Sequence, residues 1–169
     1  MEVRLAGLVP NSNANGLGTR DVLFAQGCSH ACPDCFNKHT WDFSGGKLCD
    51  CDELIKQCAD RTYLAGVTFS GGDPFDQPEA FAYIAQGLKK YNINIWSYTG
   101  YTWEQLMKLS SQKPSIKQLL ENIDTLIDGP YITNLHSEDL EWRGSSNQRI
   151  IDVQQSLKTG KIVIDNRFK

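Results

Sequence analysis

No stretch of the sequence approaches the roughly 18 uncharged apolar residues that a membrane-spanning helix needs. The chain begins Met1-Glu2-Val3-Arg4, so the apolar segment of a secretory signal is missing as well. Basic residues are not in excess, since the net charge is −3, whereas non-specific binding of nucleic acid needs a basic surface. These absences predict a cytoplasmic protein with no membrane and no nucleic acid among its partners.

Cysteine is absent from residues 59–169, although the preceding part of the chain contains six. A chain of 169 residues can build a core without disulfides, and nothing indicates secretion. Cysteines that only fill a core would be spread more evenly. The clustering therefore indicates metal binding or catalysis by some of these residues, which are Cys28, Cys32, Cys35, Cys49, Cys51 and Cys58.

Internal repeats, low-complexity segments and linkers are also missing. Hydrophobic residues make up 40% of the chain and charged residues 22%, which is typical of a globular protein. We therefore expect a single domain over residues 1–169.

Short apolar strand patterns alternate with helical patterns along the chain. We expect strands over residues 21–26, 66–70, 93–98 and 125–128, with weaker ones at 149–153 and 161–164. Helices are expected from residues 50–52 onward, over about 77–91, after Thr102 and over 116–123, and the polar residues 11–18 predict a loop. This alternation predicts βαβ units on a mostly parallel sheet.

Ligands of such sheets bind at the carboxyl ends of the strands. Four expected strands are followed by distinctive loops: the cysteines of 28–35, Gly-Gly-Asp-Pro at 71–74, Tyr-Thr-Gly-Tyr at 98–101 and Asp-Gly-Pro at 128–130. If the strands are parallel neighbours, the four loops converge on one rim and form a site.

The spacing Cys28-x3-Cys32-x2-Cys35 places three thiols within eight residues. A structural zinc site uses four protein ligands, and an electron-transfer 4Fe-4S protein uses four cysteines. Three cysteines on four irons leave one iron open to a small molecule with an amine and a carboxylate. A Cys3His zinc site that includes His30 or His39 remains an alternative.

The other three cysteines have simpler interpretations. Cys58 falls at helical spacing with Leu54 and Ile55 and is expected to be buried. Cys49 and Cys51 lie beside a turn, where we expect thiols near solvent, and a redox role for this pair is only a weak hypothesis.

Two motifs together resemble those of the radical S-adenosylmethionine (SAM) superfamily. The first is the three-cysteine motif with Phe36 after its last cysteine, and the second is Ser70-Gly71-Gly72-Asp73-Pro74, which is similar to Gly-Gly-Glu-Pro. Neither motif is decisive alone, but both occur in order at the ends of successive expected strands.

Further segments resemble one family within that superfamily, the activating proteins of anaerobic (class III) ribonucleoside-triphosphate reductase. They are residues 15–20, 35–41, 98–102, 128–131 and 142–149, of which Trp-Arg-Gly-Ser-Ser-Asn-Gln is the most specific. The resemblance covers about residues 15–149. Leu17 stands where the family often has proline, and about 20 residues follow Arg149.

The resemblance implies an α/β fold, namely a shortened, open partial (β/α) barrel with a mostly parallel sheet, a core of about residues 15–150 and a C-terminal extension of 151–169. It implies a radical SAM oxidoreductase with one 4Fe-4S cluster, ligated by Cys28, Cys32 and Cys35, and SAM on the fourth iron. The reduced cluster cleaves SAM to methionine and a 5′-deoxyadenosyl radical, which takes hydrogen from a glycine of the reductase. An electron donor such as flavodoxin or ferredoxin is implied too.

The same resemblance implies the residues that contact SAM. Asp34, Cys35 and Phe36 belong to the loop expected beside SAM, with Phe36 near the adenine, and backbone carbonyls of Gly71 and Gly72 accept its ammonium. Two further positions have open interpretations: Asp73 assists there or caps the next helix, and Tyr98 lines the site or only packs. Arg143 has three possible interpretations: it binds a SAM carboxylate, it contacts the surface of the partner, or it forms a surface ion pair. No side chain is needed as a general acid or base.

Three alternatives stay open at this point. The protein activates another glycyl-radical enzyme or acts on a small molecule, it is a zinc-stabilised binding module without catalysis, or it is a pure electron carrier.

Overall fold

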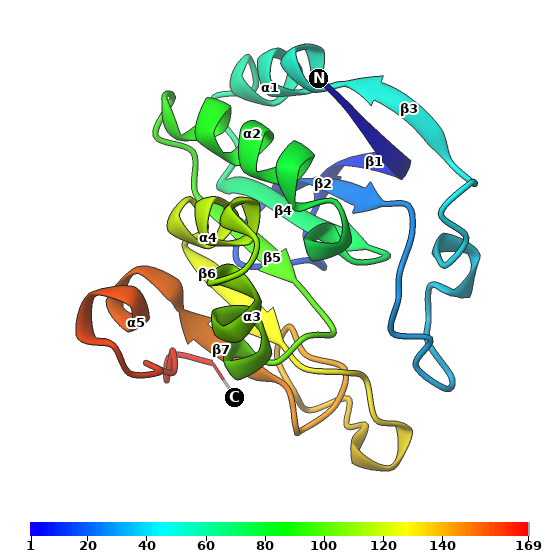
Figure 1. Ribbon diagram of the computed structural model, residues 1–169, viewed down its shortest axis with the longest axis vertical. Helices are drawn as coiled ribbons and strands as arrows, with labels where there is room; N and C mark the ends of the chain where they lie inside the picture. The colour runs from blue at the N-terminus through cyan, green and yellow to red at the C-terminus, as the bar shows by residue number, and fades with distance from the viewer. Residues whose placement is uncertain (169) are drawn as a thin grey trace.

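Four parallel strands form the middle of a seven-stranded sheet in the computed structural model, which describes residues 1–168. The order across the sheet is β3-β1-β2-β4-β5-β6-β7 (Figure 1). Strands β2, β4, β5 and β6 run parallel, whereas β1, β3 and β7 pair antiparallel at the two sides. The predicted α/β class is confirmed, with a mixed sheet. The strands are β1 (Glu2–Ser12), β2 (Arg20–Ala25), β3 (Lys47–Asp50), β4 (Gly66–Gly71), β5 (Ile95–Tyr98), β6 (Thr125–Asp128) and β7 (Arg149–Asp152).

The helices gather on one face of this sheet (Figure 1). They are α1 (Cys51–Ala59), α2 (Pro78–Lys89), α3 (Trp103–Ser110), α4 (Pro114–Glu121) and α5 (Val153–Thr159), with 3-10 turns η1 (Lys38–Thr40), η2 (Pro74–Asp76) and η3 (Thr133–Leu135). Within residues 1–168, no helix has both the length and the apolar character to cross a membrane.

Strand alternation divides the sheet residues between two faces. Leu23, Phe69 and Ile95 belong to the main core with the helices. Their neighbours Thr68 and Trp96 belong to the opposite face, where Trp96 packs in a small second cluster. This second face carries no helix, and its residues are buried beneath Trp142, Phe168 and the 13–19 loop.

The longest strand, β1, lies where the sequence predicted no strand. Its pairing with β2 has register shifts between Leu5 and Gly7 and between Val9 and Ser12. Bulges of this kind break the period-two pattern, and Pro10 weakens it further. Because β3 pairs only with Glu2–Leu5 of β1, Pro10 lies on a free edge, where proline is tolerated.

Three smaller expectations have different outcomes, of which one is confirmed. Cys58 is buried as predicted, but Cys51 is fully buried at the start of α1, so the prediction of a solvent-near thiol there was wrong. The expected strand at 161–164 is reduced to an isolated bridge between Ile151 and Ile164.

Arg20 is a buried cation on the helix-free face, with 1% of its surface exposed. Its guanidinium donates to Thr68 Oγ1 at 2.8 Å and to the backbone oxygens of Val67 and Asn94, and it lies 5.3 Å from the ring centroid of Trp96. Burial lowers its pKa to about 10. Since the same group reaches Leu17 O, Arg20 connects the 13–19 loop to β4 and β5.

We expect Arg20→Met to lower the free energy of unfolding by about 2–4 kcal/mol, because several buried acceptors lose their donor. Urea denaturation followed by circular dichroism measures this. The control Arg167→Met removes an exposed guanidinium paired with Asp165, and its effect should stay within about 0.5 kcal/mol. Equal effects of the two substitutions would contradict the role of the buried network.

Candidate metal and cofactor site

A pocket of about 240 Å³ lies at the carboxyl ends of the parallel strands. Residues that follow β2, β4, β5 and β6 all contribute to it, so the predicted convergence of four loops is confirmed. The predicted site residues that line it are Cys28, Cys32, Cys35, Phe36, Gly71, Gly72 and Tyr98. Asp34 and Asp73 are not part of its lining.

The cysteine loop leaves β2 through Gly27, whose φ of +106° is left-handed. The Gly27 amide donates to Thr40 O at 2.6 Å and the Cys28 amide to Trp41 O, so the far end of the loop returns to its start. Ala31 and Asp34 also have positive φ, a conformation that bends the chain sharply. The loop thereby turns the three thiols, each partly buried and free of disulfides, into one pocket.

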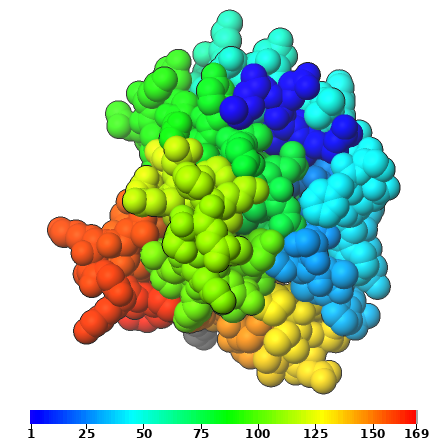
Figure 2. Space-filling view, viewed as in Figure 1, coloured from blue at the N-terminus to red at the C-terminus, as the bar shows by residue number. Residues whose placement is uncertain are grey.

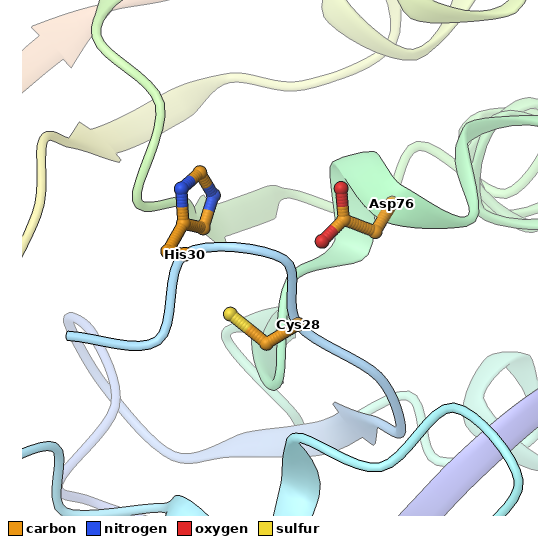
Figure 3. Close-up of side chains that lie close together, drawn as sticks. All are labelled: Cys28, His30 and Asp76. Carbon is orange, nitrogen blue, oxygen red and sulfur yellow. The ribbon is translucent and has the colours of Figure 1, made fainter.

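The sulfur atoms of Cys28, Cys32 and Cys35 do not form a close group of the kind that binds a single metal ion. Within residues 1–168, the one group of ligand atoms that lie within 4.8 Å of each other comprises Cys28, His30 and Asp76 (Figure 3). It includes a single cysteine, and His39 is exposed outside the pocket. A cluster differs from a zinc ion because each thiolate binds a different iron, so wider sulfur separations fit it.

Burial raises the pKa of the Cys28 thiol to about 11, despite opposing backbone hydrogen bonds near residues 30 and 31. The free thiol is therefore neutral at pH 7, and a metal must displace its proton to bind.

Gly71 and Gly72 stand where the end of β4 touches the end of β2. A Cβ on Gly72 would lie 2.2 Å from Gly27 O, and one on Gly71 2.4 Å from Ala25 N. The amides of Gly72 and Asp73 donate to Ala25 O and Gly27 O. Glycine is therefore required by the approach of two backbones, in addition to any approach of a ligand.

Asp73 is fully buried beneath the pocket. Its Oδ1 accepts from the Phe75 amide and caps η2. Its Oδ2 accepts from Thr99 Oγ1 and the Gly100 amide, both at 2.9 Å, and contacts His30 Nε2 at 2.6 Å. Of the two roles considered for Asp73, the cap is present.

His30 has an elevated pKa. Burial lowers it, but the hydrogen bond to Asp73 and the charges of Asp73 and Asp76 outweigh that effect. The ring also packs edge-on against Tyr101, with centroids 4.3 Å apart.

Phe36 lies at the mouth of the pocket and 69% of its surface is exposed, so it is not a core residue. Its ring centroid is 4.9 Å from that of Tyr131. Nearby, Thr133 Oγ1 donates to Asp34 Oδ2 at 2.9 Å. The cysteine loop and the segment after β6 therefore meet at the surface, as the blue and yellow regions do in Figure 2.

Tyr98 and Arg143 have partners within the chain. Tyr98 Oη donates to Trp142 O at 2.7 Å, and burial raises its pKa. Arg143 donates to Gln148 O, while its buried Nε has no partner among the described residues. Arg143 does not line the pocket.

Several lining residues were not predicted as site residues from the sequence, among them Trp41, Tyr131 and Gln148. Trp41 borders the pocket directly after η1. Tyr131 follows β6, so the strand-end rule that located the other loops could have found it. Gln148 gave no such signal, because only the fold brings it beside Gly129, whose carbonyl accepts from Gln148 Nε2.

Comparisons with known proteins agree with this geometry. The family model "4Fe-4S single cluster domain" matches residues 14–151. The anaerobic ribonucleoside-triphosphate reductase-activating protein of Haemophilus influenzae is 38% identical over 149 residues, which cover 83% of this chain and 92% of the relative. The corresponding protein of enterobacteria phage T4 is 35% identical over 150 residues, 85% of this chain and 90% of the relative. That of Escherichia coli K12 is 36% identical over 149 residues, 82% and 92%. The chain belongs to the family of anaerobic ribonucleoside-triphosphate reductase-activating proteins.

Proposed function

We propose that this protein is a radical SAM enzyme that activates an anaerobic ribonucleoside-triphosphate reductase. The observation that carries this proposal is the pocket in which Cys28, Cys32 and Cys35 meet the Gly71-Gly72 turn. The relatives bear the name of that activity. When bound, the reduced cluster and SAM supply a 5′-deoxyadenosyl radical that removes a hydrogen atom from a glycine of the reductase.

The residues present fit a 4Fe-4S cluster with one open iron. Three thiols from one loop supply three ligands, and a fourth cysteine is missing from the lining, since Cys49, Cys51 and Cys58 all lie elsewhere. An iron without a protein ligand can take the amino and carboxylate groups of SAM. A pure electron carrier would use a fourth cysteine, and a single zinc would need closer ligand atoms.

The chain's own residues hold and orient SAM in this proposal. The carbonyls of Gly71 and Gly72 accept from its ammonium, and Phe36 lies against its adenine. Cys35 and Tyr98 complete the contacts, with Tyr98 offering its ring because its hydroxyl already donates to Trp142 O, whereas Asp34 precedes Cys35 but lies outside the lining. Asp73 supports the site from beneath. No side chain moves a proton in the reaction, so the protein's tasks are orientation and exclusion of water.

The helix-free face supports a partial barrel as the finer description of the fold. In a closed (β/α)8 barrel the helices form an outer ring and the sheet encloses the interior. Here too the helices cover only one face of the sheet. The sheet does not close on itself, because β3 and β7 are its two outermost strands. We infer that the chain is one radical SAM domain with residues 151–169 as an extension. The open side of this domain admits the glycine-bearing loop of the reductase.

We predict that the electron donor is a protein such as flavodoxin or ferredoxin. The reaction is proposed to take place in the cytoplasm. Activation of another glycyl-radical enzyme is the second candidate, and an assay with candidate partners separates the two.

We expect Cys28→Ala, Cys32→Ala and Cys35→Ala each to abolish glycyl-radical formation, because each removes an iron ligand. The measurements are iron and sulfide content after anaerobic reconstitution, and the glycyl-radical EPR signal of the co-incubated reductase. The control Cys49→Ala alters a partly buried cysteine outside the pocket and should keep both signals. A variant of Cys28, Cys32 or Cys35 with full iron content and full radical yield would contradict the assignment.

We expect Phe36→Ala to raise the dissociation constant of SAM about 5- to 30-fold, since an aromatic contact contributes about 1–2 kcal/mol. Equilibrium dialysis of the reconstituted protein measures it, and the iron content should be unchanged. Tyr63→Ala is the matched control, because Tyr63 is 68% exposed and lies outside the pocket. If both variants bind SAM like the parent protein, Phe36 does not contact the adenine.

A further inference from the structure

The carboxylate of Asp73 joins three segments that are distant in the sequence. Its Oδ1 caps η2, directly after β4. Its Oδ2 accepts from Thr99 and Gly100, which follow β5, and contacts His30 of the cysteine loop. Asp73 is 0% exposed, so its contacts are shielded from water. Hydrogen bonds are stronger in such a buried environment than in water.

Asp76 extends the same connection to the start of the cysteine loop. It accepts from the Ser29 amide at 2.8 Å and from Ser29 Oγ at 3.1 Å. Tyr101 Oη donates to the same carboxylate at 2.8 Å. Two adjacent residues of the loop, Ser29 and His30, are therefore attached to the carboxylates of Asp76 and Asp73 at one short turn. Figure 3 shows Asp76 beside the loop that carries Cys28 and His30.

Gly100 makes room for the His30 ring. A Cβ at position 100 would lie 2.5 Å from Cδ2 of that ring. The backbone after β5 thus approaches His30 closely, while its amide donates to the carboxylate that His30 contacts. The His30 ring therefore lies between Asp73 and Gly100.

We propose that Asp73 and His30 form a positioning pair that fixes the Cys28 end of the cysteine loop, and that Asp73 acts through His30 rather than by contact with SAM. The inference rests on the proposed function. Cys28 lies two residues before His30 and one before Ser29, so a loop released from the pair no longer presents the Cys28 thiol at a defined place.

The occupancy of Asp73 argues against direct binding of SAM. Its two oxygens already have four partners, and the residue is absent from the pocket lining. An ammonium group could reach it only by displacing a buried donor, and a buried donor without an acceptor costs about 1–3 kcal/mol. His30, in contrast, both contacts Asp73 and lines the pocket.

The first test uses the cluster-free protein. Asp73→Asn replaces one accepting oxygen by an NH2 group, and His30→Phe keeps a ring but removes the hydrogen bond. We expect both to speed hydrogen exchange of the peptide that spans residues 28–35 by at least about 10-fold, as measured by mass spectrometry. His30→Gln retains a donor and should restore most of the protection. Asp152→Asn changes a carboxylate that caps α5 and should leave this peptide unchanged.

The second test is a double-mutant cycle on the SAM dissociation constant of the reconstituted protein. We expect Asp73→Asn and His30→Phe each to raise it about 10-fold, and the double variant to stay within about 3-fold of either single variant, because both break one connection. The EPR signal of the reduced cluster should shift alike in all three variants.

The outcomes separate this inference from the proposed function. Unchanged exchange of residues 28–35 in Asp73→Asn would mean that Asp73 does not hold the loop, and a double variant about 100-fold weaker than the parent would mean that the two residues act on SAM independently. Either result overturns the inference. If the parent protein assembles no cluster, the proposed function fails, and the exchange experiment still decides whether Asp73 and His30 hold the loop.

Discussion

The contact between the backbones at the ends of β2 and β4 is the constraint on which the site depends. Gly72 N donates to Ala25 O at 2.7 Å and Asp73 N donates to Gly27 O at 2.9 Å. No side chain fits between these strands at this point. The cysteine loop therefore begins directly beside the Gly-Gly turn, and the three cysteines and the two glycines line one pocket.

Buried carboxylates extend that order to the neighbouring loops. Asp73 at the end of β4 ties η2 to the segment after β5. Asp128 at the end of β6 has the same function further along the sheet, because it accepts from the Trp103 amide and from Arg149. Each carboxylate satisfies backbone amides that would otherwise lack an acceptor at the end of a strand. The rim of the pocket is thus organised by charge-assisted hydrogen bonds rather than by apolar packing.

The two faces of the sheet are stabilised by different kinds of contact. Helices and apolar side chains fill one face, as in the main core of Leu23, Phe69 and Ile95. The other face carries Arg20, whose guanidinium donates to buried acceptors. The pocket lies at the carboxyl ends of the same strands. A chain of this size can leave that face without helices because its proposed substrate is a segment of another protein.

The sequence by itself determined the α/β class, the parallel strands, the loops at their ends and the three cysteines, because each depends on a local pattern or spacing. It did not reveal β1, whose bulges break the alternation, or the burial of Cys51. Only the tertiary structure decided that Gly71 and Gly72 serve contact between strands, that Tyr131 and Gln148 border the pocket, and that Asp73 meets His30. These pairs lie far apart in the chain, and their contact follows from strand order and register, which no local pattern specifies.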